Sequence, residues 1–295
     1  MDSTALKQAT ADSPRAAYAA PDVCLALTHA VSQAIAADQN ILPTLERIIA
    51  LFRSTLQFDY GAFWREDEQT HVTSCVLARH ADFLDTSAFV EMSCSMSFMP
   101  GPGGLIRTVL KSREPLLVED LCAAPGLRRA EAATRAGLKT ALAFPLLAGG
   151  QVIGALEFFG RLPQPRDEHL LMTAASVGIL AGEFMVRRRA EESHREFVQL
   201  APNAIVVHCE GRYVFANRAA VQMLAAGDES QILGKDPYFF VHAEHLEPSR
   251  ERVRRLYEGR ADVPMVESRF VRLDGEVIDV EVMSRKMLWI AGLPA

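Results

Sequence analysis

The sequence lacks the residue patterns of several protein classes. Its five cysteines are scattered, and none forms a CxxC or CxxxxC pair, which argues against a structural zinc site. The net charge of −6 argues against general nucleic-acid binding, because such proteins present basic faces. Residues 1–20 contain no apolar core stretch, so we interpret them as a mobile tail and not as a signal peptide.

Long hydrophobic runs are almost absent as well. Residues 170–186 are the one candidate for a membrane span, but a helix of this length reaches only about 25 Å, less than the hydrocarbon core of ~30 Å. Glu183 lies inside the run, and an acidic side chain is costly in lipid. We therefore expect a soluble helix, no membrane span, and a cytoplasmic protein with reduced thiols.

The patterns that are present divide the chain into about two domains. In the first, helical periodicity over residues 22–57 breaks near Asp38-Gln39-Asn40, which also supplies caps for the second helix. A last long helix begins near Asp167 and runs to about Leu200. Between these helices, strands are predicted at 60–65, 72–79, 115–119, 140–146 and 152–159. This order predicts an α+β fold with helices packed on one face of an antiparallel sheet.

The last hundred residues contain two hairpins. The first, in Ala204–Ala220, turns at Glu210-Gly211 and ends at Asn217, which we assign a structural role at the start of a helix. The second turns at Asp274-Gly275. A charged helix over 248–257 lies between them, and its mixed Arg and Glu residues predict a solvated face with i,i+4 pairs.

These pieces resemble two known families. FDYGAFWRED, GPGGLIRTVLKSREPLLVEDL, AGLKTALAFPLLAGGQVIGALEFFG and the terminal helix DEHLL…FMVRRRAEE make residues 21–190 similar to a GAF domain that ends in a long connecting helix. ILGKDPYFFVHAEHLEPSRERVRRLYEG and VRLDGEVIDVEV make residues 191–295 similar to a PAS domain. Both families have antiparallel sheets with flanking helices. A fourth PAS strand is expected at 285–290 and the last strand is missing, so we interpret the chain as a fragment of a longer receptor.

The resemblance implies a sensory input region and no catalytic constellation of its own. An effector outside the chain, a histidine kinase of a two-component system, a cyclic-di-GMP enzyme or a transcription regulator, would then produce the output. The cofactor stays unknown, because no motif for bilin, haem, flavin or zinc is present. His242 and His245 lie earlier than the position that haem PAS domains use, so a cap or turn role is preferred.

We predict ligand-binding residues in both domains. In the GAF-like domain, Arg107 would offer a cation to an anionic ligand. The Gly-rich turn at 101–104 either shapes a cavity wall or only supplies positive φ angles at a corner. In the PAS-like domain, Phe270 and Trp289 line a cavity or merely fill it. The full GAF set is Phe63, Cys75, Phe98, Arg107 and Phe144.

The connecting helix has two interpretations. Small or apolar residues recur close to a/d spacing, which suits either a parallel homodimer seam or packing on the helix's own sheet. The family resemblance favours the homodimer, with the helix as the transmission element. The residues of this stripe are Leu171, Ala174, Gly178, Ala181 and Met185.

Two other functions remain open. A GAF-type thiol redox enzyme would use Cys75, Cys94 or Cys122, for instance through a Cys94–Cys122 pair. A pure dimerisation scaffold would bind no ligand at all. We prefer binding of a small molecule or a partner, because the GAF-like motifs are followed along the chain by the PAS-like motifs.

Overall fold

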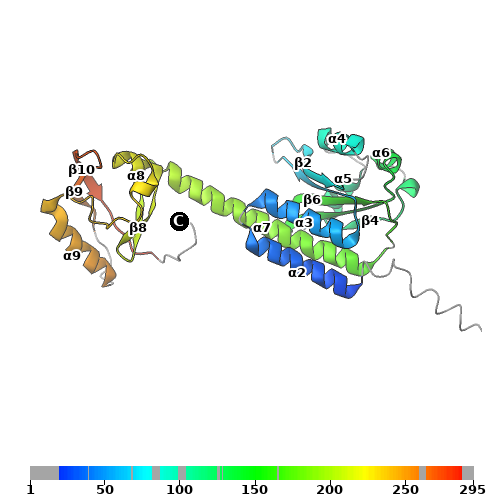
Figure 1. Ribbon diagram of the computed structural model, residues 1–295, viewed down its shortest axis with the longest axis horizontal. Coiled ribbons are helices and arrows are strands. Elements are labelled where there is room, and N and C mark those ends of the chain that lie inside the picture. Colours follow the sequence, from blue (N-terminus) through cyan, green and yellow to red (C-terminus); the bar gives the residue numbers. More distant parts are fainter. Residues whose placement is uncertain are drawn as a thin grey trace, which may run out of the picture. The chain divides into compact units, whose positions relative to one another are not determined.

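The computed structural model describes residues 20–38, 40–67, 69–81, 87–98, 104–124, 127, 129–164, 166–258 and 264–287. The chain divides into two compact units, 1–189 and 190–295 (Figure 1). Helix α7 (Glu168–Leu200) begins in the first unit and ends in the second. The long helix predicted from Asp167 to Leu200 is therefore confirmed.

The first unit is built on a six-stranded antiparallel sheet in the order β3-β2-β1-β6-β5-β4. Its two outermost strands contain only two and three residues. The five predicted strands are confirmed within two residues at each end. The strand bounds are Tyr60–Glu66 (β1), Thr73–His80 (β2), Ser97–Phe98 (β3), Leu116–Val118 (β4), Thr140–Ala148 (β5) and Gln151–Gly160 (β6).

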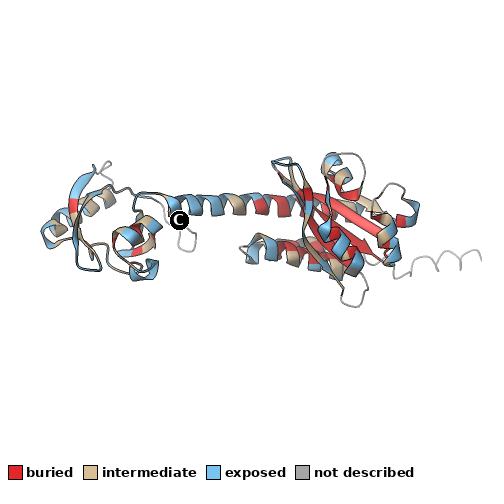
Figure 2. Ribbon diagram, turned by 90° about the horizontal axis from the view of Figure 1, so that it is seen from above, coloured by how far each residue is buried: buried red, intermediate tan, exposed pale blue. Residues whose placement is uncertain are grey.

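Helices cover both faces of this sheet, so the expectation of helices on one face is wrong (Figures 1 and 2). Strands β1, β5 and β6 are buried along most of their length, because apolar residues point to both sides and each side needs a cover. The α7 face carries α2 (Pro21–Ala37), α3 (Ile41–Leu56) and α7. The α5 face carries α4 (Ser87–Ser95), α5 (Leu105–Ser112), η1 (Leu121–Ala123) and α6 (Ala130–Arg135).

The break between α2 and α3 lies where the sequence predicts it, but the cap differs. Asn40 occupies the N-cap position of α3, and its side chain makes no capping hydrogen bond. Its backbone N–H instead donates to the Asp38 carboxylate at 3.1 Å, and its carbonyl accepts from the Thr44 hydroxyl at 2.8 Å. The backbone of the loop therefore starts the helix without a side-chain cap.

Helix α7 lies unusually close to strand β5. A Cβ atom on Gly178 would lie 2.2 Å from the Pro145 carbonyl oxygen, and one on Gly182 would lie 2.3 Å from that of Leu147. Only glycine allows this approach, because the neighbouring atoms belong to backbone. The small residues of the helix therefore serve contact with the sheet.

The stripe predicted as a dimer seam consequently faces the chain's own sheet. Ala174, Gly178, Ala181 and Met185 are buried in the core of the α7 face, and Leu171 packs against it. Of the two interpretations, the structure shows the sheet packing. Within the described residues, α7 is the one helix whose length and composition would suit a membrane span, and half of that apolar window is buried inside the protein.

The second unit contains two hairpins and short helices. Glu210 and Gly211 both have positive φ angles, 50° and 72°, as a tight two-residue hairpin turn requires, and Gly275 has φ of 87° in the second hairpin. Both predicted turns are confirmed. The element bounds are Val206–Cys209 (β7), Arg212–Ala216 (β8), Arg218–Met223 (α8), Glu229–Gln231 (η2), Ala243–His245 (η3), Leu246–Tyr257 (α9), Val266–Val271 (β9) and Val277–Val282 (β10).

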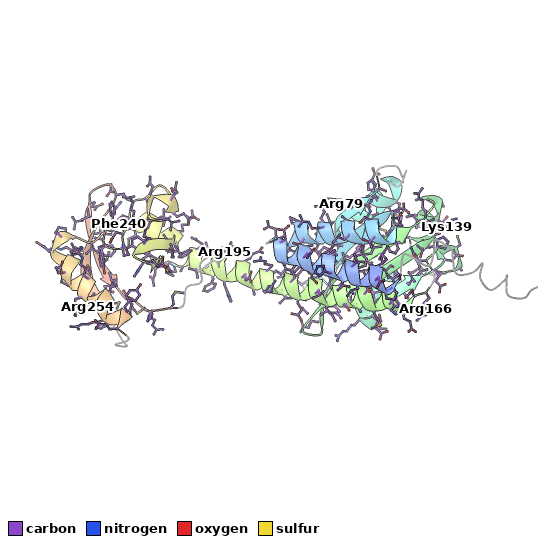
Figure 3. The ribbon with its side chains drawn as sticks, turned by 60° about the horizontal axis from the view of Figure 1, so that its bottom comes forward. Arg79, Lys139, Arg166, Arg195, Phe240 and Arg254 are labelled. Atoms are coloured by element: carbon purple, nitrogen blue, oxygen red, sulfur yellow. The ribbon has the colours of Figure 1, made fainter. Side chains whose placement is uncertain are left out.

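The core of this unit is small and centres on Phe240, which is fully buried (Figure 3). Phe270 packs against this core from β9. Residues 285–287, the first half of the expected fourth strand, are not in a strand. Residues 288–290, which include the predicted lining residue Trp289, lie outside the described residues. On α9, Arg254 and Arg255 both pair with Glu251, at 2.7 and 3.1 Å, which confirms the predicted charged surface.

Asn217 joins three elements of the second unit. Its amide oxygen accepts from the backbone N–H groups of Ile205 at 2.8 Å and Ala220 at 3.0 Å, which caps α8. Its amide nitrogen donates to the carbonyls of Asn203 at 2.9 Å and Val198, in the last turn of α7, at 3.1 Å. The structural role predicted for this residue is confirmed, and it ties the end of α7 to the first hairpin.

Candidate functional site

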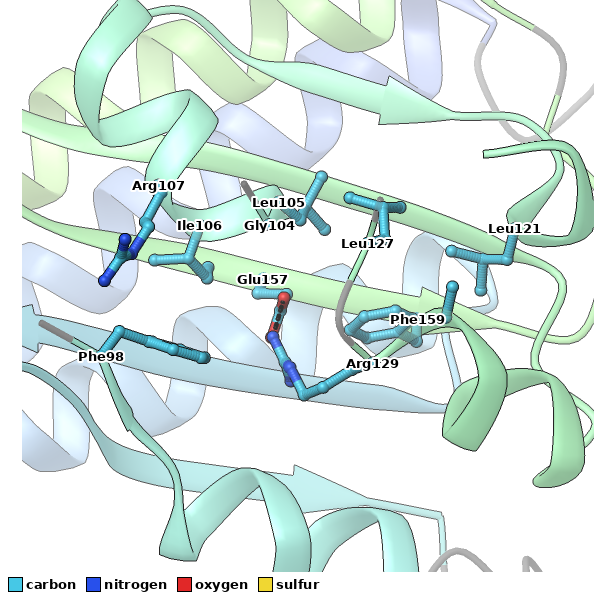
Figure 4. Close-up of a pocket in the computed structure, with 11 residues that line it drawn as sticks. Phe98, Gly104, Leu105, Ile106, Arg107, Leu121, Leu127, Arg129, Glu157 and Phe159 are labelled. Atoms are coloured by element: carbon cyan, nitrogen blue, oxygen red, sulfur yellow. Dashed lines mark hydrogen bonds and ion pairs between the residues drawn. The ribbon is translucent and has the colours of Figure 1, made fainter. Parts of the chain in front are cut away.

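The α5 face contains a small, partly open cavity of about 20 Å³ (Figure 4). This volume is enough for roughly one water molecule. Its walls come from β6, from α5 and from the segments that precede α5 and α6. The residues that matter for its chemistry are Phe98, Leu105, Arg107, Arg129, Glu157 and Phe159.

A buried ion pair forms one side of the cavity. Glu157 projects from the centre of β6 and is fully buried, while the Arg129 side chain is 7% exposed. One carboxylate oxygen accepts from the Arg129 guanidinium, and the other accepts from the Trp64 indole N–H at 3.0 Å. Arg129 also donates to the Ser93 hydroxyl at 3.0 Å. Both charges are thus compensated, as burial requires.

Aromatic rings enclose the same guanidinium. The Cζ atom of Arg129 lies 4.8 Å from the ring centroid of Trp64, 5.5 Å from that of Phe159 and 5.7 Å from that of Phe89. These separations are within the range of cation–π attraction. We call Trp64, Phe89 and Phe159, together with the Glu157 carboxylate, the aromatic cage.

The electrostatics of the cage favour a cation. Burial lowers the pKa of the Arg129 guanidinium, but the adjacent Glu157 carboxylate more than offsets this effect, so the pKa lies above its ordinary value. Burial, and then the Glu157 charge, raise the pKa of the Tyr60 hydroxyl well above its ordinary value. The tyrosine therefore stays neutral, and Glu157 is the negative charge that balances a cation in the cage.

A second cation lies at the edge of the cavity. The Arg107 guanidinium, from α5, lies 5.8 Å from the Phe98 ring centroid and is half-buried. Both residues were predicted to line a ligand cavity, and the structure brings them together in one wall. Gly104, the described residue of the Gly-rich turn, has φ of 91° and precedes α5; residues 101–103 lie outside the described residues.

The other predicted lining residues lie elsewhere. Phe63 and Phe144 belong to the core of the α7 face, on the opposite side of the sheet. A strand alternates its side chains, so an error of one residue moves a prediction to the wrong face. Cys75 packs beside the α5-face core without lining the cavity. The sequence analysis did not identify Arg129 or Glu157. Glu157 could have been identified, because it is the one acidic residue in the apolar run QVIGALEFFG.

The three candidate redox cysteines do not form one cluster. The Cys75 thiol, in β2, donates to the Leu77 carbonyl at 3.6 Å, and burial together with the neighbouring Cys94, in α4, raises the pKa of Cys75 to about 12. Cys122 is exposed in η1, which follows β4 at the opposite edge of the sheet from β2. The structure thus brings together Cys75 and Cys94, whereas the sequence analysis considered a Cys94–Cys122 pair.

His242 has the cap role that we expected. The His242 ring nitrogen accepts from the Glu244 backbone N–H at 3.4 Å and caps η3. His245 lies at the N-cap position of α9 but makes no side-chain cap there; its ring accepts from the Arg269 side chain at 3.5 Å. Within the described residues, no group of three or more His, Cys, Asp or Glu side chains could hold a metal ion.

Comparison with known proteins follows the division into two units. A family model described as a GAF domain matches residues 43–181, and one described as a PAS fold matches residues 192–294. Sporulation kinase A from Bacillus subtilis (strain 168) is 30% identical over 91 residues. That match covers 31% of this chain and spans only 15% of the length of the kinase.

Solved structures with a similar fold include a GAF domain and a reductase. The GAF domain of a phosphoenolpyruvate-protein phosphotransferase from Coxiella burnetii has 16% identity and a TM-score of 0.49, and the match covers 59% of this chain and 99% of that one. Free methionine-R-sulfoxide reductase from Neisseria meningitidis has 12% identity and a TM-score of 0.46, with 57% and 92% covered. By these two family matches, the chain contains a GAF domain followed by a PAS domain.

Proposed function

We propose that this chain is the input region of a signalling protein, and that its GAF domain binds a small ligand in the cavity of the α5 face. The observation that carries the proposal is the Arg129–Glu157 ion pair inside this cavity. A buried ion pair contributes little to stability compared with apolar packing, so stability alone does not account for it, and we attribute it to ligand recognition. Binding would change how α5 and α6 pack on the sheet.

The ligand signal would pass to the PAS domain through α7. In the GAF domain, α7 is packed directly on β5, and in the PAS domain Asn217 bonds to its last turn. The match to sporulation kinase A supports a kinase as the effector, and we infer a histidine kinase in a cytoplasmic two-component system. A cyclic-di-GMP enzyme or a transcription regulator are the other effector classes compatible with this input.

The input region would act as a homodimer through a face of α7 other than the one predicted from the sequence. Met172, Ile179 and Val186 recur every seven residues, and their exposed fractions are 69%, 48% and 41%. A seven-residue apolar repeat is the pattern of a helix that pairs with a second helix. Sedimentation of an Ile179→Glu variant tests this face: we expect a monomer, with Thr108→Glu, at an exposed position of α5 on the opposite side of the sheet, as the dimeric control.

Native mass spectrometry of the freshly purified chain, with an absorption spectrum of the same sample, tests the ligand. We expect a mass excess that denaturation releases, and whose loss lowers the melting temperature of the GAF domain. A chain at its bare mass, whose GAF melting temperature no compound in a metabolite panel raises, would contradict ligand sensing. That result would instead support a ligand-free dimerisation scaffold.

Thiol redox chemistry is the second candidate, because Cys94 is close enough to Cys75 to raise the pKa of its thiol. Two thiols can give two electrons and two protons to a peroxide, which forms water and leaves a disulfide. The raised pKa of Cys75 makes it a poor first nucleophile, so Cys94 would attack the oxidant. Turnover that depends on an added dithiol, and that Cys94→Ser abolishes, would support an enzyme; wild-type protein without such turnover would exclude it.

A further inference from the structure

The cage around Arg129 has the composition of a binding site for an organic cation. Three aromatic rings surround the guanidinium at 4.8 to 5.7 Å, and a fully buried carboxylate bonds to it. Aromatic faces attract cations through the negative charge of their π systems, and desolvation strengthens the attraction. A site that only had to be stable would be filled with apolar side chains, because they avoid the cost of burying two charges.

The cage and its occupant are held by different parts of the fold. Trp64, Phe159 and Glu157 lie on β1 and β6, the two central strands of the sheet. Arg129 instead lies at the N-terminus of α6, a helix of six residues whose one fully buried side chain is Ala133. Three of the four cage residues are therefore anchored in the sheet and the fourth, Phe89, lies on α4, whereas the occupant is carried by a short helix with one fully buried residue. Such an element can move without disrupting the sheet.

We propose that the aromatic cage is a binding site for an organic cation of the guanidinium or alkylammonium class, and that Arg129 is an internal occupant which this ligand displaces. The inference rests on the proposed ligand-sensing function and specifies its ligand class. With Arg129 in place, only about 20 Å³ remains free, so a ligand of this class must replace the side chain. Arg107, which lines the same cavity outside the cage, would then contact an anionic group of the ligand.

In this proposal a free cation competes with the Arg129 side chain for the aromatic cage, and the effect of that competition on affinity can be estimated. A tethered group competes at an effective concentration in the millimolar range or above, so a simple free cation binds weakly to the unmodified chain. Apparent affinity falls in proportion to the fraction of molecules whose site is open. Removal of the Arg129 side chain should therefore increase the affinity for a small guanidinium compound at least ten-fold.

The experiment uses the full chain with Trp289→Phe, so that Trp64 is its single tryptophan. Methylguanidinium chloride is titrated into this parent and into Arg129→Ala, with sodium chloride as the ionic control and methylurea as the neutral control of similar shape. We expect a saturable change in Trp64 emission and a rise in melting temperature for Arg129→Ala with methylguanidinium only. The midpoint should lie at least ten-fold below that of the parent.

Two further variants separate binding from general effects. Arg135→Ala removes an exposed arginine of the same helix, which pairs with Glu131, and should behave as the parent does. Arg129→Ala combined with Glu157→Gln keeps the vacant space but loses the counter-charge, and should lose the saturable response. If Arg129→Ala does not fold in the absence of a cation, Arg129→Lys keeps the charge with a weaker fit and should also bind methylguanidinium more tightly than the parent.

The inference is overturned if neither variant of Arg129 responds saturably to methylguanidinium, or if methylurea or the Arg135→Ala variant gives the same response. Its failure is distinct from failure of the proposed function. A neutral or anionic molecule released in native mass spectrometry would leave ligand sensing intact and exclude the cation site. Cation binding that changes Trp64 emission but not hydrogen exchange in α7 would support the site and contradict the relay.

Discussion

Gly178→Ala distinguishes a helix packed on its own sheet from a helix packed on a partner. Alanine is the better helix former by about 1 kcal/mol, so at a neutral helix position the substitution would stabilise the GAF domain. Here the added Cβ would lie 2.2 Å from the Pro145 carbonyl oxygen. Overpacking costs about 1–3 kcal/mol, and the upper end applies because a backbone atom of a central strand cannot turn aside. The net loss is about 2 kcal/mol.

For a domain of this size that loss corresponds to a fall in melting temperature of roughly 4–8 °C. Trp64 emission in a Trp289→Phe background follows the GAF domain during thermal or urea unfolding, since Trp64 is buried in its core. Ser176→Ala, at an exposed position of the same helix, is the control and should change stability by less than about 0.5 kcal/mol. A Gly178→Ala variant as stable as the parent would refute the close approach of α7 to β5.

Three other substitutions test the remaining features. Glu157→Gln leaves the buried Arg129 charge uncompensated and should lower the free energy of unfolding in urea by about 3–5 kcal/mol. A decrease under about 1 kcal/mol would show that the ion pair is not buried. Mild oxidation with diamide should remove two hydrogens and form a Cys75–Cys94 disulfide that peptide mapping detects, and Cys94→Ser should prevent this disulfide. A disulfide from Cys94 to any other thiol would contradict the proximity of Cys75 and Cys94. Asn217→Ala removes the α8 cap and should destabilise the PAS domain by about 1–2 kcal/mol, with faster amide exchange at Ile205; unchanged exchange there would argue against the bond.

The order of elements could be predicted because it depends on local residues. The glycine turns at Gly211 and Gly275 fix the hairpins, since few other residues adopt positive φ, and the apolar runs between them mark the strands. The faces of the central strands could not be predicted in the same way. Strands such as β5 are apolar on both sides, so nothing in their own sequence shows which side meets which helix. Phe63 and Phe144 were therefore assigned to the ligand cavity although they lie behind it.

The chemistry of the cavity depends on contacts between distant residues. Arg129 and Glu157 are 28 positions apart, and Trp64 is 93 positions from Glu157, so no motif joins them. The role of Gly178 was ambiguous for a related reason, because a small residue allows close approach to a partner helix or to the helix's own sheet alike. Only the position of Pro145 beneath it decides between the two.

The two shortest strands limit how the GAF domain can assemble. The sheet ends at β3 and β4, which offer two and three residues of backbone. A strand from another molecule needs a longer row of free N–H and C=O groups to pair with. Pro145, beyond the last β4 partner of β5, also lacks the N–H that would extend such pairing along β5. At β3 and β4 themselves the sheet therefore offers little backbone for edge-to-edge pairing.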